Sequence, residues 1–175
     1  MENFSELVRL RRSMRKFTDE IPSAEEVKTI LRAALMAPSS KGLHSYEFVV
    51  VDDKQVLGQL ASCKARGGEF LSEAPMAIVV MGDPEVCDVW IEDASVASTM
   101  ILLQAEDLGL GACWIQMRDR TDSEGGSAEE NVRKLLDIPK HMRIVSIIAI
   151  GHKGMERKPQ NEERLLWEKV HTGKW

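Results

Sequence analysis

The order of the predicted helices and strands indicates an α+β fold. Four apolar, β-branched-rich runs are predicted as strands, at residues 46–51, 76–81, 110–117 and 144–150. Segments with apolar residues at helical spacing precede or separate them, without the regular alternation of strand and helix that builds a doubly wound parallel sheet. With 175 residues and 43% apolar content, the chain is expected to form a single domain, 1–175, with a substantial core.

The first predicted helix opens with a capping pattern. Asn3 stands three residues before Glu6, which is the spacing of a residue that caps a helix and a partner in the first turn. Phe4, Leu7 and Val8 then fall on one side of the helix, and we expect that side to be buried. A run of arginines follows at the far end of this helix.

A second capping pattern, Ser23 with Glu26, opens the next helix, which Pro38 ends. The apolar positions of this helix recur at helical spacing, at Val27, Ile30, Leu31, Ala34 and Leu35.

Residues 89–108 form the longest helical segment, with Gly109 as its left-handed cap. One stripe along it is rich in small residues: Ala94, Ala97, Ile101, Ala105 and Leu108. Small residues let another backbone come close, so we expect this helix at the centre of the molecule. A further helix starts at Ser127 and ends before Pro139, and strand 144–150, the most apolar, is expected in the middle of the sheet.

The charge and composition exclude several classes of protein. The formal net charge is −5 and the isoelectric point is near 5.5, so a general nucleic-acid binder is not expected. No apolar run approaches the ~20 residues of a membrane-spanning helix, and no apolar stretch follows a basic start, so we expect neither a membrane partner nor a signal peptide. Cys63, Cys87 and Cys113 have neither disulfide nor zinc spacing, which favours a reducing, cytoplasmic setting and no bound metal.

A cluster of cations in this acidic chain calls for an anionic partner. Arg11, Arg12, Ser13 and Arg15 place three guanidinium groups and a hydroxyl within five residues. Arginine matches phosphate oxygens with a rigid fork of donors and keeps its charge at working pH. The alternative is a solvated helix end whose cations interact with the helix dipole.

Three further segments have the composition of binding loops, although each also has a structural interpretation. Residues 37–44 concentrate hydroxyls, a glycine and His44 between a helix and a strand, and could equally be a surface turn. Residues 109–115 combine small residues at a helix-to-strand turn, and could equally be a cap that leads into a buried strand. Arg157, Lys158 and Pro159 add a basic point far along the chain, of a kind that is usually solvated.

The polar C-terminal segment cannot form its own core. Its apolar residues are scattered, at Leu165, Leu166, Trp167, Val170 and Trp175. Such a segment is either disordered or packed on a partner, and its large apolar residues favour a partner subunit.

Together these pieces resemble the flavin-dependent nitroreductases, a family whose fold also includes the iodotyrosine deiodinases. The resemblance covers nearly the whole chain and rests on four pieces in order: Arg11-Arg12-Ser13-x-Arg15, Ala37-Pro38-Ser39-Ser40, Gly109-Leu110-Gly111-Ala112-Cys113-Trp114, and Ile150-Gly151 followed by Arg157-Lys158-Pro159. It implies a central, mainly antiparallel sheet flanked by helices, in an intertwined homodimer. Residues 151–175 would be an arm that wraps the partner subunit, and the helix 89–108 would be the dimer core.

The resemblance also implies the residues that bind FMN. Arg11 and Ser13 would hold the flavin phosphate with Arg12 nearby, and Arg157 would approach it from the far end of the chain with Lys158 as a helper. Arg15 would reach the pyrimidine side of the ring and stabilise the reduced flavin. The ring would also be lined by a loop of the other subunit, at Pro38, Ser39 and Ser40, and by the turn at Ala112, Cys113 and Trp114.

The loop after Ser40 departs from the pattern of the family. Where members often carry Asn and Gln, this chain has Gly42 and His44. His44 could replace the Gln as a hydrogen-bond donor to the ring, or could be a loop histidine whose hydrogen bonds are satisfied internally.

The implied activity is an oxidoreductase that uses NADH or NADPH to reduce nitroaromatics, quinones or similar small molecules by ping-pong kinetics. The flavin carries the chemistry, so no catalytic side chain is expected. A flavin carrier or redox sensor without turnover, a reductive dehalogenase, and a binder of nucleic acid or acidic protein remain as alternatives. The physiological acceptor, the choice between NADH and NADPH and the metabolic context are not encoded in these motifs.

Overall fold

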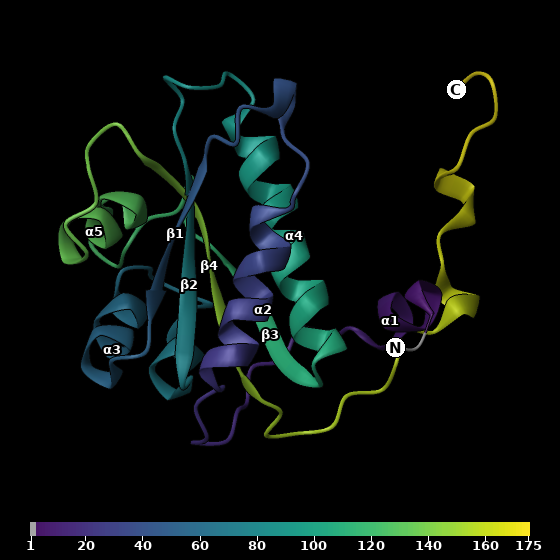
Figure 1. Ribbon diagram of the computed structural model, residues 1–175, viewed down its shortest axis with the longest axis horizontal. Helices are drawn as coiled ribbons and strands as arrows, with labels where there is room; N and C mark the ends of the chain where they lie inside the picture. Colours follow the sequence, from purple (N-terminus) through teal and green to yellow (C-terminus); the bar gives the residue numbers. More distant parts are fainter. Residues whose placement is uncertain (1–2) are drawn as a thin grey trace.

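The computed structural model, shown in Figure 1, describes residues 3–175 and contains one four-stranded sheet in the order β1-β2-β4-β3. The strands are Tyr46–Val51 (β1), Met76–Gly82 (β2), Leu110–Gln116 (β3) and Arg143–His152 (β4). All three neighbouring pairs are antiparallel. The α+β class, the antiparallel sheet and the central place of the last strand are confirmed.

Two layers of helices cover the two faces of the sheet. The helices are Phe4–Leu10 (α1), Ala24–Leu35 (α2), Lys54–Ser62 (α3), Trp90–Asp107 (α4) and Ala128–Leu135 (α5). In Figure 1, α2 and α4 lie on one side of the sheet, and α3 and α5 lie on the other. The sequence did not predict α3, which Asp53 caps at its N-terminus.

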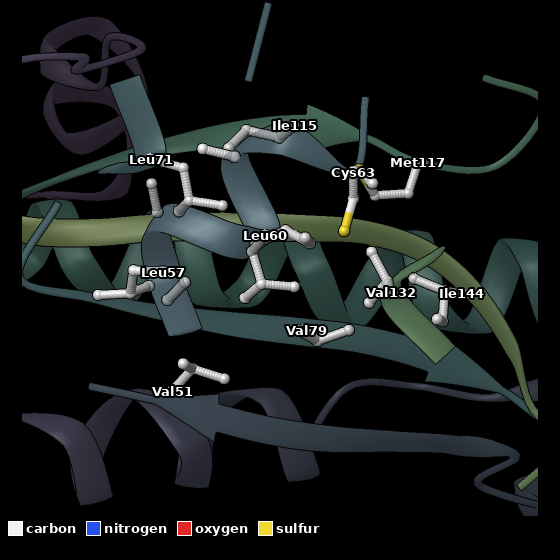
Figure 2. Close-up of a cluster of buried hydrophobic side chains, with 14 of the residues drawn as sticks. Val51, Leu57, Leu60, Cys63, Leu71, Val79, Ile115, Met117, Val132 and Ile144 are labelled. Atoms are coloured by element: carbon white, nitrogen blue, oxygen red, sulfur yellow. The ribbon is translucent and has the colours of Figure 1, made fainter. Parts of the chain in front are cut away.

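The alternation of side chains along β2 explains the two cores. Ile78 and Val80 pack with α2 and α4, and both are fully buried. Val79 faces the opposite way, into the cluster that α3 and α5 share with the sheet. Figure 2 shows this second cluster, in which Leu57 and Leu60 of α3 approach the sheet. Because both faces of the central strands are covered, their sequences are continuously apolar.

The small-residue stripe places α4 at the centre, as predicted. Ala94, Ala97, Ile101 and Ala105 have no exposed surface, which lets α4 pack closely on α2 and the sheet. Gly109 follows the helix with φ of +77°, the left-handed conformation expected of a helix cap.

The buried face predicted for α1 is wrong for the single chain. No residue of α1 is buried, and Phe4 and Val8 are 68% and 45% exposed. α1 is short and lies beside the body next to the C-terminal segment (Figure 1), so Phe4 and Leu7 reach only a shallow pocket with Met100 and Leu103.

The C-terminal segment, residues 153–175, extends away from the sheet (Figure 1). Beyond residue 160 its large apolar side chains are at least half exposed: Leu165, Leu166, Trp167, Val170 and Trp175. None of the helices within residues 3–175 has the length and apolar character needed to cross a bilayer.

Candidate functional site

The segment after α1 lies across the start of β3 and the end of β4. Ser13 forms a parallel bridge with Ala112, where the Met14 amide donates to the Ala112 carbonyl over 2.9 Å. Further on, Phe17 forms an antiparallel bridge with Lys153. The segment 13–17 is therefore fixed by main-chain hydrogen bonds at an end of the sheet.

Two glycines make this close approach possible. A Cβ at Gly111 would lie 2.5 Å from Cγ of Met14, and one at Gly154 would lie 2.8 Å from the backbone of Phe17. Any side chain at either position would push the segment 13–17 off the sheet. Gly111, which belongs to the predicted helix-to-strand turn, thus has a packing role as well.

Several residues of the predicted FMN site act on Cys113 of β3. Burial raises the pKa of this thiol, and the charges of Arg15, Arg11 and Arg157 together with a hydrogen bond to Ser13 oppose that rise. The bridge between Ser13 and Ala112 sets residues 11–15 beside β3, and the hydrogen bond from Arg12 to the Lys158 carbonyl brings Arg157 to the same end of the sheet. The fold therefore brings residues 11–15, β3 and Arg157 to one end of the sheet, and their binding of a phosphate stays a prediction.

Arg12 has a different set of contacts from its neighbours. Its Nη1 donates to the Lys158 carbonyl and, over 3.3 Å, to the Pro159 carbonyl. The Gln160 amide also donates to the Arg9 carbonyl over 2.8 Å. Arg12 thus ties the C-terminal segment to the end of α1, and this contact brings Arg157 beside the cluster. Lys158 takes part through its carbonyl.

Arg15 is exposed, and its guanidinium carbon lies 5.9 Å from the centre of the Phe70 ring. Phe70 was not predicted at the site, because it belongs to a short 3-10 helix, Glu69–Glu73, that carries no recognisable motif. Trp114 on β3 is half-buried, and its indole Nε1 donates to Gln116 over 2.9 Å.

The loop that contains Pro38, Ser39, Ser40, Gly42 and His44 lies elsewhere, at the start of α4. Its anchor is the buried carboxylate of Asp93, which accepts from the Ser40 amide over 2.9 Å and from the Ser45 hydroxyl over 3.3 Å. Asp93 was not predicted at the site, because 53 residues separate it from Ser40.

The two halves of the predicted site do not meet within one chain. Asp93 marks the first turn of α4, whereas Glu106, which pairs with Lys153 over 2.6 Å, marks its last turn. Thirteen residues of α-helix separate these two positions by about 20 Å. The serine loop and the arginine cluster therefore sit at opposite ends of α4.

The cluster suits a phosphate monoester on chemical grounds. Arg11, Arg15 and Arg157 supply three permanent positive charges, and Ser13 supplies a hydroxyl beside main chain that is held close to β3. Arg157 also lines a neighbouring pocket of about 460 Å³, together with Arg12, Lys153, Glu106 and Glu156.

Comparisons with known proteins agree with this fold. The sequence profile of the nitroreductase family matches residues 8–66 and 54–152. A protein from Archaeoglobus fulgidus that is named as an NADH dehydrogenase/NAD(P)H nitroreductase is 31% identical, with all of both chains covered. A Thermotoga neapolitana protein named iodotyrosine deiodinase is 23% identical over 93% of this chain and 96% of its own.

Solved structures of nitroreductases have the same fold. An FMN-dependent nitroreductase from Clostridium difficile R20291 superposes with a TM-score of 0.94 and 46% identity, covering 97% of this chain and 98% of its own. A structure from Parabacteroides distasonis, named as an NADH dehydrogenase/NAD(P)H nitroreductase, superposes with a TM-score of 0.89 and 31% identity, covering 98% of both chains. The fold is thus of the nitroreductase class. The chain belongs to the nitroreductase family.

Proposed function

We propose that this chain is an FMN-dependent oxidoreductase that takes electrons from NADH or NADPH and passes them to nitroaromatics, quinones or similar small acceptors. The observation that carries the proposal is the convergence of Arg11, Ser13, Arg15 and Arg157 at the start of β3 in a nitroreductase fold. A solved structure with the same fold is named FMN-dependent nitroreductase, and a sequence relative from Bacillus subtilis is named FMN reductase (NADPH).

Different residues of the site bind different parts of FMN. Arg11, Ser13 and Arg157 hold the phosphate by charge-assisted hydrogen bonds, and the backbone near Ala112 and Cys113 packs against the flavin ring. Arg12 fixes the C-terminal segment, so that Arg157 stays in reach.

The chemistry of hydride acceptance and donation comes from the bound flavin. The protein contributes orientation and electrostatics. Arg15 is an exposed member of the cluster, and its positive charge lies where the pyrimidine side of the ring is expected. This charge favours the reduced, more negative form of the ring.

The separation of the two half-sites supports a homodimer. Because Pro38, Ser39, Ser40 and His44 lie at the other end of α4 from the arginines, only the loop of a second copy can line a ring held by this chain's cluster. The exposed apolar residues of segment 153–175 and an open apolar groove of about 740 Å³ beside α2 offer surface for the same contact. This arm would wrap the partner subunit.

Anaerobic reduction tests the proposal directly. The protein reconstituted with FMN is mixed with NADH and, separately, NADPH, and the flavin absorbance near its visible maximum is followed. We expect bleaching by at least one nucleotide and reoxidation by members of a panel of nitroaromatic, quinone and halogenated aromatic acceptors.

Other results of this experiment would contradict the proposed activity or favour a different one. A yellow protein that neither nucleotide bleaches contradicts the enzyme and indicates a flavin carrier or sensor. A protein that takes up no FMN contradicts the whole proposal. Preferential reoxidation by iodinated phenols would instead favour reductive dehalogenation, the activity in the name of the Thermotoga neapolitana relative.

A further inference from the structure

A chain of hydrogen bonds connects the backbone of the serine loop to the ring of His44. The Tyr46 hydroxyl is buried, and its oxygen lies 2.8 Å from the Ala37 carbonyl oxygen and 3.3 Å from that of Leu35. The same hydroxyl lies 2.8 Å from Nδ1 of His44. The two rings meet edge to face, with their centroids 5.7 Å apart.

The chemistry of these groups fixes the direction of each bond. The Tyr46 and Ala37 oxygens lie 2.8 Å apart, which is a close contact between two oxygens unless a hydrogen lies between them. A carbonyl oxygen only accepts, so this hydrogen is the single hydroxyl hydrogen of Tyr46. Burial and the negative charge of Asp93 raise the pKa of Tyr46, which keeps the hydroxyl protonated. With its hydrogen already used, the hydroxyl can only accept from His44. Nδ1 of His44 is therefore the donor and carries a proton.

The backbone holds the ring in this position. His44 has φ of +48°, and its amide donates to the Ser39 hydroxyl oxygen over 3.0 Å. The Ser40 amide is in turn held by Asp93. Left-handed backbone at a residue with a side chain is uncommon and persists where surrounding bonds impose it. The loop is thus constrained at both ends of the segment 39–44.

The other ring nitrogen is open. His44 is exposed, and among residues 3–175 no hydrogen bond uses its Nε2. In a neutral imidazole with its proton on Nδ1, Nε2 carries only a lone pair. The loop therefore presents a fixed hydrogen-bond acceptor to whatever lies against it.

We propose that Tyr46 locks His44 as the Nδ1–H tautomer, so that Nε2 accepts a hydrogen bond from the N3–H imide of FMN. This inference rests on the proposed function, in which the loop of one copy lines the flavin held by the other. The oxidised flavin ring carries one N–H, at N3, while its O2, O4, N1 and N5 only accept. An acceptor-only nitrogen therefore has a single partner on this ring, and His44 has the opposite role to the donor suggested by its position in the sequence.

The tautomer is testable without any ligand. In mildly alkaline buffer, long-range ¹H–¹⁵N correlation spectra of the full-length protein labelled with ¹⁵N-histidine distinguish the two neutral forms. We expect His44 as Nδ1–H, and conversion to Nε2–H in Tyr46→Phe, because that variant removes the acceptor of the Nδ1 proton. An Nε2–H ring in the unsubstituted protein overturns the proposal, whether or not the Phe variant folds.

The contact to the ligand is tested by FMN labelled with ¹⁵N at N3. We expect the N3–H signal of bound FMN to exchange slowly with water in the unsubstituted protein and rapidly in His44→Asn, with a dissociation constant for FMN about tenfold higher in the variant. Asparagine tolerates the left-handed backbone but cannot reach as far as Nε2. His141→Asn, on an exposed histidine of another loop, should change the constant by less than about twofold.

The outcomes separate the two proposals. Tight FMN binding with an N3–H signal that is unaffected by His44→Asn overturns the hydrogen bond and leaves the proposed function standing. Failure of the unsubstituted protein to bind FMN overturns the proposed function and the N3 contact with it.

Discussion

At the scale of single residues, the start of β3 gathers positive charge from two ends of the chain. Arg11 and Arg15 come from the segment after α1, and Arg157 comes from the C-terminal segment. A single substitution there changes one charge while leaving the main-chain hydrogen bonds of the segment in place. The residues can therefore be tested one by one.

Arg11→Ala should weaken FMN binding about tenfold to a hundredfold, because a hydrogen bond to a charged group contributes about 1.5–3 kcal/mol. Fluorescence titration of the FMN-free protein measures the change. Arg66→Ala, which removes an exposed arginine from another loop, serves as the control. Equal dissociation constants for both variants would remove Arg11 from the phosphate site.

Arg15→Gln should lower the reduction potential of the bound flavin more than it weakens binding. Loss of a positive charge beside the ring destabilises the reduced form, and 1.4 kcal/mol corresponds to about 30 mV for a two-electron couple. Potentiometric titration measures the shift, and Arg15→Lys, which keeps the charge, should restore most of it. An unchanged potential in the Gln variant would rule out this role for Arg15.

Glu129 is a structural carboxylate away from the proposed site. Its Oε1 accepts from Arg133 over 2.8 Å, from Arg143 over 2.5 Å and from the Ile144 amide over 3.2 Å. Burial alone raises the pKa of Glu129, but the hydrogen bond and charge of Arg143 and the other two contacts outweigh it, so the pKa is lowered.

Glu129→Gln should therefore lower the free energy of unfolding by about 3 kcal/mol at neutral pH, since it removes the buried charge that Arg133 and Arg143 share. Because the pKa is lower in the folded state, this stabilisation is present above the ordinary pKa of glutamate and is lost as the pH falls through the folded-state value. Urea titrations at several pH values should show the two proteins converge in acid. Glu130 is an exposed neighbour, so Glu130→Gln should change the free energy of unfolding far less.

At the scale of elements, the sequence placed most helices and strands correctly because the signals are local. The caps Asn3, Ser23 and Ser127 accept hydrogen bonds from the third residue of their helices, as their spacing predicted. α3 was missed because it is short and contains Gly58, although Asp53 as a cap and Leu57 with Leu60 at helical spacing were signals for it.

Gly111→Ala tests how the segment 13–17 is seated on β3. The new methyl group would overlap Met14, so we expect a loss of about 1–3 kcal/mol in stability and weaker FMN retention. Gly58→Ala is the matched control, because nothing lies within 4 Å of its Cβ position, and alanine in a helix should stabilise by about 0.5–1 kcal/mol. Thermal unfolding and flavin release measure both effects. Equal melting temperatures for the two variants would contradict the close contact at Gly111.

At the scale of the whole molecule, the single chain leaves apolar surface uncovered on α1 and on the C-terminal segment, in addition to the groove beside α2. Phe4 and Val8 of α1 are exposed, and so are Trp167 and Trp175 of the C-terminal segment. Exposed apolar surface of this extent is typical of a protein–protein interface. The proposed homodimer gives both places a partner, and it joins the half-sites at the two ends of α4.

Deletion of residues 161–175 should shift the protein from dimer to monomer and reduce FMN retention. The deletion keeps Arg157, Lys158 and the Gln160 amide bond to Arg9, so it removes the arm without the phosphate contact. Sedimentation velocity with absorbance at protein and flavin wavelengths reports both results. A truncated protein that sediments as a yellow dimer would show that the arm is not needed for assembly.

The sequence by itself determined the α+β class, the limits of most elements and the motifs of the site, because caps, periodicity and turn residues act over a few positions. Only the tertiary structure decided which of the motifs meet. Arg12 reaches the Lys158 carbonyl across 146 residues, and Asp93 anchors Ser40 across 53. Such contacts depend on strand order and helix packing, which local patterns do not encode. For the same reason the sequence did not predict that the apolar side of α1 is exposed in the single chain. Nor did it predict the hydrogen-bonding role of His44, which follows from the Tyr46 hydroxyl beside it.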